Sequence, residues 1–423
     1  MLCIRLWKGW GIKMMTFPND WTETTLGKSV QIARGASPRP IEAFLTASID
    51  GVNWIKIGDA PKNSKYITHT AEKITVSGAR KSVTVREGDF ILSNSMSFGK
   101  PYILTVDGCI HDGWLRLFDY NEQINKEFLY YILFFRHIQE QFATFAAGSG
   151  VQNLNKDVVK RVVVHLPSKP EQKAIAEILT VFDTHIANLT ELIEKKKAIR
   201  EGALEDLISG KTRLSGFNSE WISISFDEYF TLLSNNTYSR DKLAEHGQVG
   251  NIHYGDILIK YSEIVTDEDE IPFLRPEITY SDNWLLHTND VIIADTAEDE
   301  TVGKAIQICE VSVPLVGGLH TIVCRPKFET AHGFLGLYIN SKSYHDQLLP
   351  HITGIKVSSI SKKAIKTTVL TIPSEIEEQS AIVGIITAMD KEIRSLEEER
   401  DKMIKIREGA MDDLLTGKVR LTD

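Results

Sequence analysis

Apolar side chains recur at alternating intervals of four and three residues in two separate stretches of the chain. The first stretch runs from residue 175 to residue 207, and the second from residue 382 to residue 414. A seam with a mean period of 3.5 residues is typical of long helices that pack as a coiled coil. The apolar seam residues are Ile175, Leu179, Phe182, Ile186, Leu189 and Ile193 in the first stretch, and Ile382, Ile386, Met389, Ile393, Leu396 and Met403 in the second.

Both stretches end in residues that suit helix termini. Pro170 and the Glu-rich segment 375–378 favour helix starts, while Gly210 and Gly417 favour helix stops. We therefore predict a first helix over 171–208, about 57 Å long at 1.5 Å per residue. An amphipathic helix on a globular core is the simpler alternative, but the seam is narrow and the exposed positions are heavily charged.

The two helical stretches are copies of one another. Residues 172–214 align with residues 379–421 at a constant offset of 207, and 21 of the 43 aligned positions are identical. The densest identity joins Ile199–Ala203 to Ile406–Ala410. A proline corner precedes each copy, at Pro167 and at Pro373. An internal repeat of this strength predicts two equivalent structural elements.

The segments between the helices are related more faintly. Residues 17–21 resemble residues 217–221, and residues 88–92 resemble residues 289–293. Helical stretches are predicted near 127–144 and 333–349. Short strands are predicted at 54–57, 90–92, 162–165, 291–293 and 367–372, where β-branched and aromatic residues cluster.

This order predicts an α/β (α+β) fold with an internal two-fold repeat. Two globular units of divergent sequence alternate with two long helices of similar sequence. We divide the chain into an N-terminal extension (1–16), a first globular unit (17–165), a central long helix (166–216), a second globular unit (217–371) and a C-terminal long helix (372–423).

Composition excludes several classes of protein. The chain has 423 residues, of which 42% are hydrophobic, enough for the cores of two or three domains. Its four cysteines form no close pair, which excludes a disulfide framework and suits a reducing cytoplasm. No apolar run approaches the roughly 20 residues that span a bilayer. Residues 1–13 lack a continuous apolar segment and a cleavage site, so we assign them no function.

The net charge of −9 is unevenly distributed. Residues 17–165 carry 17 basic and 15 acidic side chains, whereas residues 217–371 carry 12 and 21. Residues 166–216 balance at 8 and 8, and residues 372–423 carry 8 and 13. No region is generally cationic, so any contact with nucleic acid must come from local patches or be shared with basic partners.

We find no catalytic or metal-binding motif. Ser209–Thr212 resembles the end of a P-loop, but Glu205 stands where that motif needs glycine. The dinucleotide-binding, adenine-methylation and His-Glu-x-x-His motifs are also missing. We interpret the single pairs His111-Asp112 and His345-Asp346 as surface or packing residues. The acidic runs 267–270 and 298–300 are typical of solvated loops, so we predict neither a catalytic residue nor a metal site.

Several short motifs, in this order and repeated, resemble the specificity subunit of a type I restriction-modification system. The resemblance covers nearly the whole chain from Phe17 to Thr422. It rests on Trp21 with Leu26-Gly27, on residues 54–59 and 251–257, on Glu171-Gln172 after the proline corner, and on the helix ends at 206–211 and 413–420.

The resemblance implies two target-recognition domains, each reading one half of a bipartite site in double-stranded DNA. The two helices would pack antiparallel and set the distance between the half-sites. Two adenine-N6 methyltransferase subunits would bind the repeated scaffold, and two ATP-dependent motor-nuclease subunits could join them. S-adenosylmethionine, ATP and Mg²⁺ would belong to those partners, and this chain would hold no cofactor.

Base readers need side chains that pair with groove edges: Arg or Lys with guanine, Asn or Gln with adenine, Ser or Thr with either. The loop 34–40 follows a predicted strand in the first unit, and segment 235–240 offers similar side chains in the second. Our candidate DNA-binding residues are Arg34, Ser37, Arg39, Lys56, Ser93, Asn94, Ser95 and Lys100 in the first unit, and Asn235, Asn236, Tyr238, Arg240, His253, Tyr254 and Lys260 in the second.

A different class of function stays open at this point. A coiled-coil adaptor that joins proteins without reading DNA is favoured by the acidic charge. The divergent sequences of the two paired globular units favour DNA reading instead.

Overall fold

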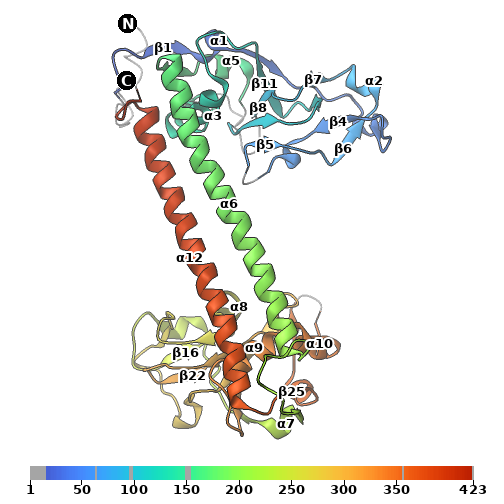
Figure 1. Cartoon of the computed structure of the whole chain (residues 1–423), viewed down its shortest axis with the longest axis vertical. Coiled ribbons are helices and arrows are strands. Elements are labelled where there is room, and N and C mark those ends of the chain that lie inside the picture. Colours follow the sequence, from blue (N-terminus) through green and yellow to red (C-terminus); the bar gives the residue numbers. More distant parts are fainter. Residues whose placement is uncertain (1–15, 62–63, 95–98, 148–153, 355–356, 422–423) are drawn as a thin grey trace. The chain divides into compact units, whose positions relative to one another are not determined.

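The computed structural model describes residues 16–61, 64–94, 99–147, 154–354 and 357–421 (Figure 1). The chain forms two compact units, Met1–Glu191 with Glu398–Asp423, and Leu192–Glu397. Two helices of 40 residues each, α6 (Lys169–Ile208) and α12 (Ile376–Leu415), contribute to both units. Of the predicted extension 1–16, residues 1–15 lie outside the described residues. No helix in the described part of the chain is both long enough and apolar enough to cross a membrane.

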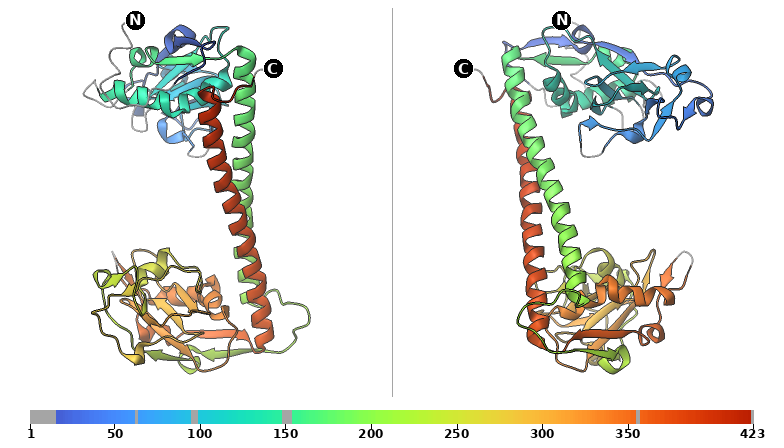
Figure 2. Two further views of the ribbon diagram at one scale, coloured as in Figure 1. Left: turned by 90° about the vertical axis from the view of Figure 1, so that its left-hand side faces the viewer. Right: turned by 45° about the vertical axis from the view of Figure 1, so that its right-hand side comes forward.

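The predicted helix over 171–208 is confirmed to within two residues by α6. In the first unit the start of α6 and the end of α12 share a hydrophobic core. In the second unit the end of α6 and the start of α12 do so. The two helices therefore run antiparallel within each unit (Figure 2). Among the seam residues Ile175, Leu179, Leu189, Ile193, Ile382, Ile386 and Ile393 are buried, and Phe182, Ile186, Met389, Leu396 and Met403 are half-buried.

The sequence repeat produces repeated contacts. In the first unit Arg407 donates to Asp183 at 2.6 Å. In the second unit Arg200 donates to Asp390 at 2.9 and 3.1 Å. Each residue of the first pair lies 207 positions from its counterpart in the second, which is the offset of the sequence repeat. The polar positions of the seam thus hold the helices together through ion pairs.

A second repeated ion pair joins an arginine just after the end of one long helix to a glutamate in the first turn of the other. Arg420 donates to both oxygens of Glu171 at 2.7 and 2.9 Å, and Arg213 donates to both oxygens of Glu378 at 3.0 and 2.6 Å. Both glutamate side chains are 1% exposed. Arg420 also donates to Asp20, which ties the C-terminal segment to the start of the first globular unit.

The predicted helix stops at glycine are also confirmed. Gly210 and Gly417 have φ angles of +70° and +71°, which glycine adopts without the steric cost that other residues meet. A Cβ at Gly417 would lie 2.4 Å from Pro18, so the close approach itself requires glycine there.

The first unit contains two five-stranded sheets and a short strand pair. In the pair, β1 (Thr22–Thr25) runs antiparallel to β12 (Val163–Leu166), which leads into α6. One sheet has the order β2 (Gln31–Arg34), β11 (Trp114–Phe118), β8 (Phe90–Ser93), β9 (Pro101–Leu104), β5 (Tyr66–Ile67). The other has the order β3 (Leu45–Thr46), β6 (Glu72–Ile74), β4 (Val52–Ile55), β10 (Gly108–Ile110), β7 (Val83–Val85).

The described residues of the second unit repeat most of this topology, with four strands in one sheet and an additional pair of β20 (Thr296–Ala297) with β24 (Ser358–Ser359). Its strand pair joins β13 (Trp221–Ser225) to β25 (Val369–Pro373). One sheet has the order β14 (Phe230–Leu233), β23 (Thr321–Pro326), β19 (Val291–Ala294), β21 (Ala305–Ile308), β17 (Ile264–Val265). The other has the order β15 (Leu243–Ala244), β18 (Phe273–Leu274), β16 (Gly250–Ile252), β22 (Leu315–Gly317). Parallel pairs also recur, since β5 with β9 matches β17 with β21, and β4 with β10 matches β16 with β22.

The predicted strands 90–92, 162–165, 291–293 and 367–372 correspond to β8, β12, β19 and β25 to within two residues, and three other predicted elements differ more. The predicted strand 54–57 is shifted to β4 because Asp59 accepts from the backbone of Lys56 and starts the short helix η3 (Ile57–Asp59). The predicted helix near 127–144 is two helices, α3 (Lys126–Phe134) and α4 (Arg136–Ala147). The predicted helix near 333–349 is likewise divided into α9 (Phe334–Asn340) and α10 (Lys342–Leu348), because Ser341 caps the second.

Candidate nucleic-acid interface

Two loops meet at one edge of the first unit. The loop 35–40 leaves β2 and lies against the turn 111–113, which connects β10 to β11. Gly35 donates to the carbonyl of Trp114 at 2.9 Å, and Ala36 donates to that of Ile110 at 3.2 Å. A Cβ at Gly35 would lie 2.1 Å from the carbonyl oxygen of His111, so only glycine allows this approach. The two loops therefore form one surface.

Asp112 is the centre of that surface. The hydroxyl of Ser37 donates to Oδ1 of Asp112 at 2.7 Å, and Arg39 lies 3.7 Å from Oδ2. Arg34 donates to the carbonyl of Asp112 at 3.1 Å. The hydrogen bond from Ser37 is the main cause that lowers the pKa of Asp112, so this carboxylate is ionised at neutral pH. Arg39 keeps 83% of its side chain exposed. The structure thus brings Arg34, Ser37 and Arg39 together.

A hollow of about 730 Å³ opens beside these residues. Its lining includes Ser37, Arg39, Trp54, Lys56 and His111. Lys56 forms an ion pair of 2.6 Å with Glu72, which offsets its charge. The hollow also has apolar residues and two glutamates in its lining, so it is a mixed apolar and polar surface rather than a strongly cationic one.

Ser93 and Asn94 do not offer their side chains to a groove. Both are 1% exposed. Ser93 accepts a hydrogen bond from the backbone of Lys100, and Asn94 donates to the carbonyl of Asp112 at 2.9 Å. In this structure the two side chains hold the turn that carries Asp112, and a contact with bases stays a prediction. Lys100 is exposed, and Ser95 lies outside the described residues.

The second unit uses the same two loops with different side chains. Asn235 donates to the carbonyl of Gly318 at 2.8 Å, and Asn236 donates to that of Gly317 at 2.8 Å. These bonds join the loop after β14 to the turn between β22 and β23. Asn236 is 1% exposed, so this candidate anchors the loop, and its direct contact with a base likewise stays a prediction.

The remaining candidates of the second unit lie around the start of α8 (Tyr254–Ile259). Arg240 donates to Asp256 at 2.9 Å. His253 is 4% exposed and accepts from the backbone of Gly255, and burial is the main cause that lowers its pKa. His253 therefore caps α8, and its contact with a base stays a prediction. Tyr254 is half-buried, with its ring centroid 5.2 Å from that of His320.

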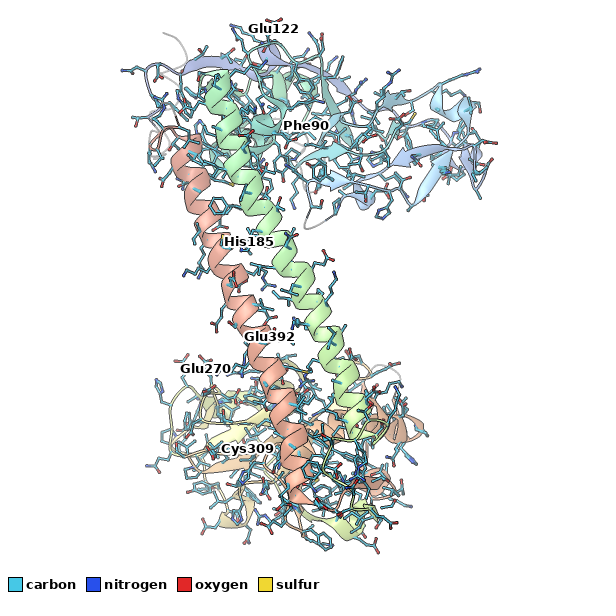
Figure 3. All side chains as sticks on the ribbon, in the orientation of Figure 1. Phe90, Glu122, His185, Glu270, Cys309 and Glu392 are labelled. Atoms are coloured by element: carbon cyan, nitrogen blue, oxygen red, sulfur yellow. The ribbon has the colours of Figure 1, made fainter. Side chains whose placement is uncertain are left out.

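Tyr238 and Lys260 lie at the margins of this surface. The hydroxyl of Tyr238 donates to the carbonyl of Thr279 at 2.9 Å. Lys260 contacts the carbonyl and the carboxylate of Glu270, and lines a hollow of about 910 Å³ together with Arg240. Glu270 itself, labelled in Figure 3, has a side chain that is 94% exposed.

The sequence matches a known domain twice. The type I restriction modification DNA specificity domain covers residues 18–198 and again residues 218–405. The chain belongs to this specificity family. It is 22% identical to the type I restriction enzyme MjaVIII specificity subunit of Methanocaldococcus jannaschii, and the match covers 96% of this chain and 94% of that protein. Members of this family form the non-catalytic recognition component of type I restriction-modification systems.

Two solved structures share the fold of this specificity subunit. The S subunit of a type I restriction-modification system from M. genitalium has a TM-score of 0.54 at 17% identity, over 95% of this chain and 99% of that chain. A second chain comes from work on complex assembly and conformational transition of the type I R-M system. Its TM-score is 0.57 at 14% identity, over 96% of this chain and 100% of that chain.

Aspartates of the acidic runs 267–270 and 298–300 accept hydrogen bonds from neighbouring loop residues. Asp267 accepts from Ser312, Asp269 accepts from the backbone of Thr266, and Asp299 accepts from Thr301. Among the described residues no group of three or more His, Cys, Asp or Glu side chains is placed to hold a metal ion.

Sequence reasoning missed three residues of the two candidate surfaces, one in the first unit and two in the second. Asp112 was set aside as half of an isolated His-Asp pair, and Asp256 and His320 were not singled out. Ser37 and Asp112 are 75 positions apart, so only the fold brings them together. His320 stands out only in the structure, where its φ of +55° is unusual for a residue other than glycine.

Proposed function

We propose that this chain recognises a bipartite DNA sequence and directs adenine methylation and ATP-dependent cleavage by partner subunits. Each globular unit reads one half of the site. The observation that carries this proposal is the pairing of one strand topology with two different loop surfaces. The first unit offers Ser37 and Arg39 beside Asp112, and the second offers Arg240 beside Asp256. Similar scaffolds with different side chains suit two readers of different base sequences.

The repeated helices suit a spacer between the two readers. Their duplicated ion pairs and seams give each unit the same support from α6 and α12. We infer that the length of these helices sets the number of base pairs between the half-sites.

The same helices present repeated apolar positions to solvent. Ile199 is 58% exposed and its counterpart Ile406 is 43% exposed. Gly202 and Gly409 face open space, although glycine inside a helix costs about 1 kcal/mol relative to alanine. Retention of exposed apolar and glycine residues in both copies supports two equivalent docking sites. Two methyltransferase subunits would occupy them and two motor-nuclease subunits could join, with S-adenosylmethionine, ATP and Mg²⁺ bound by those partners.

A mass measurement of the complex tests the docking sites. Ile199→Asp should reduce the bound methyltransferase subunits from two to one, because a charge then lies where an apolar contact forms. Val181→Asp is the matched control, since Val181 is 68% exposed but its counterpart is Ala388, so the repeat does not retain it. Two bound subunits with unchanged affinity in Ile199→Asp would show that the partner binds elsewhere.

An exchange of the first unit tests DNA reading. Residues 17–165 are replaced by the matching unit of another specificity subunit, and methylated sites are sequenced in cells that also express the methyltransferase subunit. We expect a new sequence in one half-site and no change in the other. A change in both halves, or in neither, would contradict the assignment of one reader to each unit. An adaptor that ignores DNA would yield no methylated sequence attributable to the chain.

A further inference from the structure

Arg240 is held by a hydrogen bond from its guanidinium group, yet about half of its side chain is exposed to solvent. Its Nη2 donates to Oδ1 of Asp256 at 2.9 Å, yet 53% of its side chain remains exposed. The side chain of Asp256 is 7% exposed, and its Oδ2 has no hydrogen-bond partner among the described residues. A buried carboxylate therefore holds the guanidinium group at the surface of the second unit.

The backbone is shaped to seat this guanidinium group. A Cβ at Gly255 would lie 3.0 Å from Nη2 of Arg240 and 4.0 Å from its Cζ. The first turn of α8 therefore lies directly against the guanidinium group. Arg240 thus lies against that turn with its planar group held by Asp256.

Another arginine of the same unit shows what a purely structural pair looks like. Arg325 donates through Nε and Nη2 to both oxygens of Asp290, at 2.8 and 2.7 Å, and Nη2 also donates to the carbonyl of Leu285. Nε and Nη2 of Arg325 are therefore both used inside the protein, against a carboxylate that is 0% exposed. Arg240 uses one Nη2 contact with Asp256, and no other hydrogen bond of its guanidinium group occurs within the described residues. Its remaining donors are therefore free to bind a ligand.

Aromatic side chains lie next to Arg240 and could contact neighbouring bases. The rings of His253 and Tyr254 lie 4.7 Å apart, and those of Tyr254 and His320 lie 5.2 Å apart. His320 is 46% exposed and pairs with Asp295 at 3.2 Å. The ring of His253 is buried beside the guanidinium group, and the partly exposed rings of Tyr254 and His320 continue from it.

Guanine is the base whose major-groove edge fits such an arginine. Its O6 and N7 accept two parallel hydrogen bonds, which the planar fork of arginine can donate together. We propose that Arg240 reads a guanine in the half-site of the second unit, and that Asp256 is the residue that positions it. The proposal rests on the proposed function and adds the base and the side chain that recognises it.

Sequencing of methylated sites tests the proposal in cells that express the full chain with a methyltransferase subunit. A bidentate arginine discriminates guanine from other bases by about 5- to 150-fold. Arg240→Ala should bring that preference close to parity at one position of one half-site, with the other half-site unchanged. Asp256→Asn keeps the size and one acceptor but loses the charge, so the same position should relax less. Arg275→Ala removes a nearby arginine that donates to the carbonyl of Leu243, and should leave the sequence unchanged.

Arg240→Lys separates reading from folding. Lysine keeps the charge and can still pair with Asp256, but it cannot donate as a planar fork. Relaxation at the same position in Arg240→Lys supports the proposal even where Arg240→Ala is unstable. An unchanged sequence with uniformly weaker methylation in both Arg240 variants would overturn it and indicate a phosphate contact or a structural pair. If the wild-type chain yields no two-part methylated sequence, the proposed function itself fails, which is seen before any variant is compared.

Discussion

Replacing Arg200 with alanine should destabilise the second unit by about 2–3 kcal/mol. Arg200 is 15% exposed and donates to both oxygens of Asp390 at 2.9 and 3.1 Å. It also lies 3.0 Å from Glu263, so one guanidinium group joins α6, α12 and the segment before β17. Hydrogen bonds to charged groups contribute about 1.5–3 kcal/mol each, and loss of one partner of a fully buried pair costs about 3–5 kcal/mol. Asp390 and Glu263 are 37% and 20% exposed, so water can solvate them in the variant and the cost falls below that range.

Thermal unfolding of the purified chain measures this effect. For a unit of this size each kcal/mol shifts Tm by about 2–4 °C, so we expect a fall of about 4–12 °C. Lys197→Ala is the matched control, because Lys197 pairs with Glu397 between the same helices but is 48% exposed. An exposed pair contributes less than about 1 kcal/mol, and its loss should shift Tm by no more than about 4 °C. Equal shifts in the two variants would refute the argument that the repeated Arg–Asp pairs hold the helices together.

Three further outcomes are expected. Four residues inserted near Lys195–Lys197 lengthen α6 by about 6 Å, and each base pair rises about 3.4 Å, so the spacer between half-sites should grow by one or two base pairs. Sequencing of methylated sites measures the spacer, and an active variant with the original spacer would show that helix length does not set it. The purified chain free of partners should transfer no methyl group from labelled S-adenosylmethionine to DNA, and transfer would contradict a purely recognising role. Burial lowers the pKa of His137 and His165 below the usual value of 6.5, so the folded state binds fewer protons than the unfolded state and stability should fall as pH drops below about 6.5; a double His→Gln variant should show a flatter pH dependence in urea unfolding, and an unchanged slope would contradict this cause.

The long helices could be predicted closely because their signals are local. A seam of period 3.5 and a helix stop at Gly210 depend on residues within a few turns, and α6 begins and ends within two residues of the predicted bounds. The division of the helix predicted near 333–349 could not be predicted in the same way. Polar residues 340–343 are also compatible with the exposed face of a continuous helix, and Ser341 is a cap only because its backbone is extended there.

The candidate surfaces could be predicted only in outline. Loop composition predicted exposed arginines on these loops, and Arg39 and Arg240 are both exposed beside a carboxylate. Composition does not distinguish a side chain that faces the groove from one that anchors the loop. Asn236 and Asn94 have the chemistry of adenine readers, but their amides donate to carbonyls of the facing turn. That role depends on strand order, which the local sequence does not specify.

The two units reach a similar arrangement by different routes. In the first unit the carboxylate beside the arginine comes from the turn between β10 and β11, which holds Asp112. In the second unit it comes from the first turn of α8, which holds Asp256, and the turn between β22 and β23 supplies His320 instead. Side chains on these loops can differ between the units because the hydrogen bonds that join the loops to the turns involve backbone carbonyls. The helices have no such freedom, since Arg200 and Arg407 must each meet an aspartate on the opposite helix. Strong repetition in the helices and divergence in the loops therefore follow from where each part makes its contacts.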